Sequence, residues 1–216
     1  MKGQLLHKVF HTLTEAFQNC LRRFPSTVCF VLALTVYLVY LVATDMDDDR
    51  TLVMVLGYYF SIGTLLSLTL HLWSEEIKSK IKGVIVHIVM HVLLIADAVY
   101  LYSLSPEQSL TEIGIAHGAA ILALWLSAFF LSFIKEKNDI PSWNFASYTV
   151  GAFVTANVVG RIMSGGISLL VFSLRQLFNV DVSWNCYLYI LIICSVLLPM
   201  LLFLCLLPKD EQKHNR

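Results

Sequence analysis

Six long apolar segments, separated by short polar ones, make up most of the chain. Each has about 20 residues or more, the length at which an α-helix crosses the roughly 30 Å core of a lipid bilayer. The pattern therefore predicts an all-α fold, a polytopic transmembrane helical bundle whose membrane domain covers residues 24–207. The six predicted spans are Phe24–Ala43, Thr51–Trp73, Gly83–Tyr102, Ile113–Ile134, Phe145–Phe178 and Cys186–Leu207.

The segment ahead of the first span has the periodicity of an amphipathic helix. Its apolar side chains recur three or four residues apart, as they do in a helix that lies in the membrane interface. We predict such a helix at residues 1–23, and the alternative is a helix docked on another protein domain. At the other end of the chain, the polar residues 208–216 predict a cytoplasmic tail. The apolar stripe of the first segment consists of Leu5, Leu6, Val9, Phe10, Leu13, Phe17 and Leu21.

Lysine and arginine residues are confined almost entirely to alternate loops. Short loops that carry them stay in the cytoplasm, so both termini are predicted to be cytoplasmic. Of the 15 basic residues, 12 fall on that side, Arg50 falls in an outer loop, and Arg161 and Arg175 fall inside the fifth span. The composition agrees, since 57% of the residues are hydrophobic and 14% are charged, against about 25% charged in soluble domains. A formal net charge of zero offers no basic surface for nucleic acid.

Small residues recur at every fourth position of the fifth span. Such a stripe lets a neighbouring helix approach closely, which is how spans associate when lipid offers no hydrophobic drive. As one helix this segment would be about 50 Å long, so it either tilts and protrudes or breaks near Gly165 and Gly166. We expect the fifth helix to be the packing centre of the bundle, through a stripe made of Ala152, Ala156, Gly160, Ser164 and Ser168.

Several ionisable side chains lie inside the predicted spans, where a charge costs roughly 2.5–3.5 kcal/mol on insertion scales. Asp97 and His117 fall in the outer third of neighbouring antiparallel spans, and we expect them to meet. His87 and His91 are one helical turn apart and share a face of the third span. These groups predict either polar contacts that hold helices together or a proton-responsive cluster.

Neither a metal site nor a cofactor is predicted. His87 and His91 supply two of the four ligands of a typical metal site. His87 lies nearer the inner side than Asp97 and His117, which disfavours the convergence of all four. The acidic loop at residues 45–50 has the alternate aspartates of a calcium loop but lacks the glycine and glutamate that such a loop requires.

Asn157 and Arg161 stand one helical turn apart in the fifth span, beside the small-residue stripe. Arg161 either extends to the inner membrane surface or is buried and needs an anionic partner. Asp97 is the first candidate for that partner. The candidate intramembrane polar site therefore consists of Asp97, His91, His117, Asn157 and Arg161.

The last third of the chain resembles a known family. It contains a Gly-x-Ser-Leu run at residues 166–169, an aliphatic helix that closes on Leu177 and Phe178, a short outer loop and a span that ends in Leu-Pro. Together with the opening segment KGQLLHKVFHTLTEAFQNCLRRFPSTV, these features resemble the bacterial membrane-protein family named domain of unknown function 4153, as found in Bacteroides-type bacteria. The resemblance implies a multi-pass protein of the bacterial inner membrane with no assigned chemistry. Members of that family continue with further spans, so it also implies a shortened member or a fragment.

The sequence contains no recognised nucleotide-binding, hydrolase or metalloprotease motif. The favoured function is a membrane scaffold or assembly component in the lipid bilayer, with a membrane protein or a second copy of the chain as its partner. One alternative is a small-solute or ion transporter with a polar site at Asp97, Asn157 and Arg161. A second alternative, which we favour least, is a membrane-embedded enzyme that depends on His91, Asp97 or His117.

Overall fold

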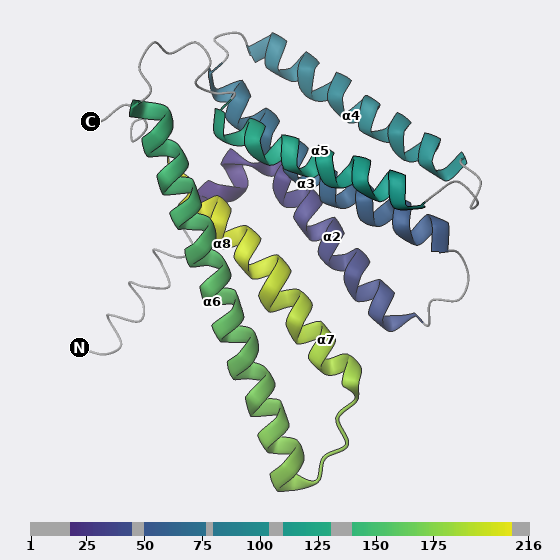
Figure 1. Ribbon diagram of the computed structural model, residues 1–216. Helices are drawn as coiled ribbons and strands as arrows, with labels where there is room; N and C mark the ends of the chain where they lie inside the picture. Colours follow the sequence, from purple (N-terminus) through teal and green to yellow (C-terminus); the bar gives the residue numbers. More distant parts are fainter. Residues whose placement is uncertain (1–17, 45–49, 77–79, 104–109, 131–139, 209–216) are drawn as a thin grey trace.

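All the regular structure in the described part of the chain is helical, which confirms the predicted fold class. The structure is a computed structural model, and it describes residues 18–44, 50–76, 80–103, 110–130 and 140–208 (Figure 1). The helices are α2 (Pro25–Ala43), α3 (Arg50–Glu76), α4 (Lys80–Ser103), α5 (Leu110–Phe130), α6 (Ile140–Phe178), α7 (Trp184–Ile192) and α8 (Leu198–Leu206), with the π-helical turn η2 (Ile193–Leu197) between the last two.

Five of the described helices are long and apolar enough to cross a membrane. They correspond to five of the six predicted spans. The remaining one, the fourth predicted span, corresponds to α5, whose apolar part is shorter at Ile113–Ala128. Of the predicted interfacial helix at residues 1–23, only residues 18–23 lie in the described part, and these are helical. Residues 1–17 and the tail at 209–216 lie outside it.

The expectation that the fifth span is the packing centre is wrong, because α3 has that place. In the apolar segment of α3, 39% of the residues are buried, whereas the share in the apolar segment of α6 is 11%. The physical reason is the number of neighbours: α3 packs against α2, α4 and α5, while α6 packs mainly along the single helix formed by α7, η2 and α8. Small side chains in the middle of α3 let the neighbouring helices approach closely, and Thr64, Ser67 and Thr69 are all buried there.

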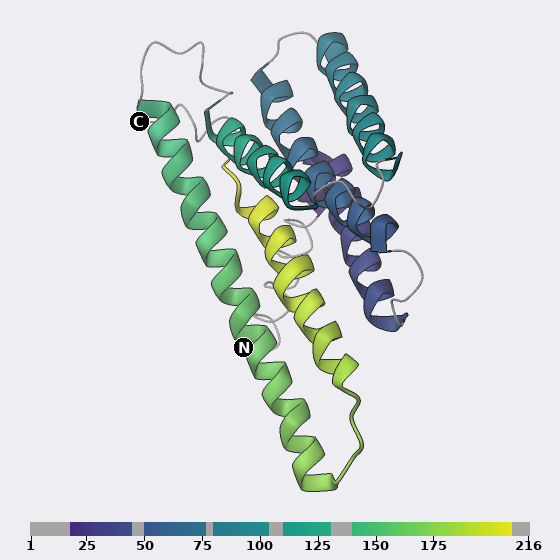
Figure 2. The same cartoon turned by 45° about the vertical axis from the view of Figure 1, so that its right-hand side comes forward.

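The fifth span forms one unbroken helix of 39 residues. The sequence left open whether this segment is one long helix or breaks near Gly165 and Gly166. The structure has the long helix, which continues through both glycines. Figures 1 and 2 show that α6 and α7 diverge from α3, α4 and α5 and extend as a hairpin beyond the ends of the other helices. The helices converge at the opposite end (Figure 1), which is the end predicted to face the cytoplasm.

Candidate functional site

The small-residue stripe of α6 is the face that packs on the last span. Ala152, Ala156, Gly160 and Ser164 are buried, and Ser168 is half-buried. The approach is closest at Gly160, where an added Cβ would overlap the carbonyl oxygen of Cys194 and the ring of Pro199. Pro199 has no N–H to donate and follows the π-helical turn. The stripe thus joins α6 to α8 inside the protein and is not available to a partner.

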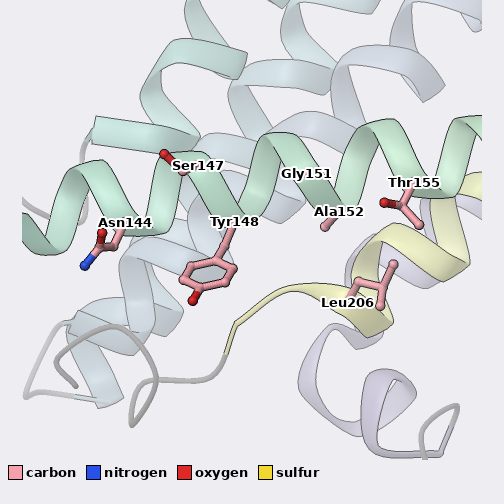
Figure 3. Close-up of a pocket in the computed structure, with 7 residues that line it drawn as sticks. All are labelled: Asn144, Ser147, Tyr148, Gly151, Ala152, Thr155 and Leu206. Carbon is pink, nitrogen blue, oxygen red and sulfur yellow. The ribbon is translucent and has the colours of Figure 1, made fainter. Parts of the chain in front are cut away.

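A second line of small residues on α6, one position away from the first, stays open. Ser147, Gly151 and Thr155 are four residues apart and exposed, and no atom of the described residues lies within 4 Å of a Cβ added at Gly151. They line a groove of about 560 Å³ along the N-terminal half of α6 (Figure 3), and the other residues that line it are Asn144, Tyr148, Ala152 and Leu206. This groove, which we call the α6 groove, has a mixed surface of hydroxyl, amide and small apolar groups.

Asp97 and His117 meet, as their depths in the sequence indicated. Nε2 of His117 lies 3.2 Å from Oδ2 of Asp97, and Nδ1 of His117 lies 2.9 Å from the carbonyl oxygen of Ile113. The ring of Tyr58 stacks on the imidazole with 4.6 Å between centroids. The Asp97–His117 pair joins α4 to α5, with the histidine buried and the Asp97 side chain 48% exposed.

The histidines of α4 form a second, separate cluster with α3. Nε2 of His91 lies 3.1 Å from Oγ of Ser67, and Nδ1 of His91 lies 2.7 Å from the carbonyl oxygen of His87. That carbonyl can only accept, so Nδ1 carries the proton and Nε2 of a neutral His91 accepts from the serine hydroxyl. The ring of His71 packs edge-on against that of His87. Ser67 is fully buried, so this serine–histidine pair joins helices and is closed to a substrate.

The five-residue polar site is not assembled in the described part of the chain. Asp97 bonds His117, and Arg161 is exposed on α6 without an ion pair to any described residue. Asn157 donates from Nδ2 to the carbonyl oxygen of Phe153 in its own helix, at 2.9 Å. Of the two alternatives for Arg161, the buried one with Asp97 as its partner is therefore wrong, because α4 packs chiefly on α3 while α6 lies along the last span.

Arg23, two residues before α2, makes the most extensive polar contact that the structure describes. Nε and Nη2 of Arg23 donate to the two carboxylate oxygens of Glu75 at 2.7 and 3.0 Å. The same guanidinium donates to the carbonyl oxygens of Leu207 and Pro208 at 3.1 and 3.0 Å. Arg23 thereby ties together α2, α3 and the end of α8, and we call this contact the Arg23 clasp.

The residues next to Arg23 position its guanidinium for this contact. Pro25 begins α2 and restricts the residue before it, and Phe24 leaves the helical conformation with φ −126°. The Phe24 ring is fully buried and packs under the guanidinium, 4.7 Å from its carbon. Nearby, a hydrogen bond to the Cys205 thiol and burial raise the pKa of the Cys20 thiol, so Cys20 stays protonated and unreactive.

The Arg23 clasp was not predicted from the sequence, in which Arg23 is one of 12 basic residues on the predicted cytoplasmic side. The pair is 52 residues apart in the sequence, and the two carbonyl acceptors lie at the far end of the chain. One signal was available: an arginine directly before a proline-started span, and a glutamate in the following cytoplasmic link.

Comparison of the chain with protein-family models, with curated proteins and with solved structures finds no match. The resemblance to domain of unknown function 4153 therefore stays a prediction. The described residues define a class of protein, an all-α bundle in which five helices are long and apolar enough to cross a membrane.

Proposed function

We propose that the protein is a membrane scaffold or assembly component whose α6 groove receives a helix of a partner membrane protein. Its proposed setting is the bacterial inner membrane, with both termini in the cytoplasm, as the cationic loops indicate. The observation that carries the proposal is the open groove beside Gly151, lined by hydroxyl and amide groups that lipid tails cannot satisfy.

The placement of the polar residues supports a structural role. Of the three residues offered for transport, Asp97 bonds His117 on the neighbouring helix, Asn157 bonds its own helix, and Arg161 is exposed, so the three do not form one polar site. The bare face of α4 differs from the α6 groove, because it is lined by bulky β-branched side chains that suit lipid, among them Val84, Ile85, Ile88, Val92 and Val99.

Site-specific photocrosslinking in living cells tests this proposal. A photoreactive amino acid at Gly151 or Thr155 is expected to give one protein adduct of defined size, because a partner helix fills the groove. The matched controls are Ile88 and Val92 on α4, which face outward and should give lipid adducts alone. Lipid adducts alone at all four positions would rule the scaffold out. A partner of the same mass as the chain would identify a second copy as the occupant.

A transporter is the second candidate, because three histidines, His71, His87 and His91, pack against one another at the α3–α4 interface. Glu75, His71, His87 and His91 succeed one another from the predicted cytoplasmic end, and Asp97 lies nearer the other end. Between His91 and Asp97 an apolar layer closes the interface, since Leu66 and Leu94 are buried there. A transporter would have to open this layer during its cycle.

Thiol labelling in a variant without native cysteines separates the two candidates. A scaffold predicts that cysteines placed at Leu66 and Leu94 stay unlabelled by a membrane-impermeant reagent, because the layer is dry. A cysteine at Ser105 in the predicted outer loop is the control, and it should react in intact cells. Labelling of Leu66→Cys and Leu94→Cys at a rate close to that of the control would favour a transporter and refute the dry layer.

A further inference from the structure

A second groove lies between α4 and α5, with α3 as its floor. It has a volume of about 460 Å³, within the range of small-molecule sites. The groove is open along α5 because three alanines there have small side chains. Leucine, isoleucine and methionine side chains form most of the other walls. The residues that line it are Ile62, Leu66, Met90, Leu93, Leu94, Asp97, Ala116, His117, Ala120, Ala123, Leu124 and Ser127.

The dimensions of this α4–α5 groove match one lipid chain. From Ala116 to Ser127 the groove follows 12 residues of α5, and the 11 helical rises between them amount to about 16 Å. That is roughly half of a 30 Å hydrocarbon core, the depth of one leaflet. Its outer end holds Asp97 and His117, and most of its length is apolar, so an amphiphile would lie with its head outward and its chain toward the midplane.

The polar end carries no net charge when its hydrogen bonds are satisfied. Both ring nitrogens of His117 face acceptor groups, the carbonyl of Ile113 and the carboxyl of Asp97. Because neutral imidazole has a single N–H, both bonds form only as imidazolium with carboxylate or as imidazole with carboxylic acid. Each of these states of the pair is neutral. A charged head would therefore meet no compensating charge, and its burial would be costly.

One acceptor at this end remains open. The Asp97 side chain is half-exposed, and its Oδ1 makes no hydrogen bond within the described part of the chain. The group that fits is a neutral hydrogen-bond donor on a hydrocarbon chain. We propose that the α4–α5 groove binds a single-chain lipid with a hydroxyl head, whose O–H donates to Asp97 Oδ1 while its chain lies against Ala120 and Leu94.

The test uses the full-length protein in nanodiscs of phosphatidylcholine, a lipid whose headgroup has no hydrogen-bond donor. A photoactivatable hexadecanol is crosslinked and the labelled residues are mapped by mass spectrometry, with unlabelled hexadecanol, its methyl ether, hexadecylamine and hexadecanoate as competitors. Saturable labelling of residues 90–97 and 116–127 is expected. Hexadecanol should compete about ten- to a hundredfold better than its ether, the range set by one hydrogen bond to a charged group.

Variants separate the head contact from the chain contact. Asp97→Leu should remove the preference for the alcohol over the ether and keep the saturable labelling. Ala120→Phe should fill the groove and abolish that labelling, whereas Ala119→Phe, at an exposed position that does not line the groove, should keep it.

Equal competition by alcohol and ether in the unmodified protein would overturn the proposal, because Asp97 would then play no part. Stronger competition by the amine or the acid would overturn the hydroxyl head. Labelling that does not saturate would show lipid contact without a site. These outcomes do not bear on the α6 groove, so the scaffold proposal is decided separately.

Discussion

Replacing Gly160 by leucine is expected to separate α6 from the last span and to cause the largest loss of stability in the bundle. Even the first added carbon would overlap the carbonyl oxygen of Cys194, which is backbone and cannot rotate away. Overpacking a tight contact costs about 1–3 kcal/mol, and a backbone obstacle places Gly160→Leu at or above the upper limit. The measurement is the midpoint temperature of unfolding of the detergent-purified protein. It is the temperature at which half of the monodisperse peak in size-exclusion chromatography is lost.

The same helix supplies the control. Gly165 and Gly166 stand one turn farther along α6, and a Cβ added at either meets nothing within 4 Å. Gly165→Leu should therefore leave the midpoint close to that of the unmodified protein, or raise it slightly, since glycine costs roughly 1 kcal/mol in a helix interior. If both leucine variants lower the midpoint equally, the helix is sensitive to side-chain size in general and the contact with Cys194 is not the cause.

Much of the fold could be predicted because each span is a local property of the sequence. A run of about 20 apolar residues must be a helix in lipid, since no water is present to satisfy its backbone. The meeting of Asp97 and His117 could also be predicted, because it needs only the depth of each residue and the adjacency of consecutive spans. The number of neighbours around each helix is a different matter. A small-residue stripe indicates one close contact, and α6 has that contact, but no local pattern indicates that α3 is packed against three helices.

The candidate sites depend on contacts that are distant in the sequence. Ser147, Gly151 and Thr155 have the same spacing as the predicted stripe, one residue earlier. Sequence alone could not say which of the two lines of small residues would be covered. The position of α8 decides this, and it covers the Ala152–Gly160 side. The alternative in which Arg161 pairs with Asp97 was wrong for a related reason, since equal depth in the membrane does not make two helices neighbours.

Replacing Arg23 by alanine is expected to destabilise the end of the bundle where α2, α3 and α8 converge. The change removes the four hydrogen bonds that the guanidinium donates to the Glu75 carboxylate and to the carbonyl oxygens of Leu207 and Pro208. A fully buried ion pair that loses one partner costs roughly 3–5 kcal/mol. The Arg23 and Glu75 side chains are 18% and 23% exposed, so screening lowers the expected loss to about 2–3 kcal/mol. The thermal midpoint of Arg23→Ala against Arg22→Ala, an exposed neighbour, measures it.

Arg23→Lys and a double-mutant cycle with Glu75→Gln then show which part of the clasp matters. Lysine keeps the charge but cannot present two parallel donors to the carboxylate while a third reaches α8, so it should recover less than half of the loss. Glu75→Gln should cost less than Arg23→Ala, because the guanidinium keeps its bonds to Leu207 and Pro208. Additive losses in the cycle would contradict a direct ion pair. Equal stability of Arg23→Lys and the unmodified protein would show that the charge alone is sufficient, and that the fork between three helices contributes nothing.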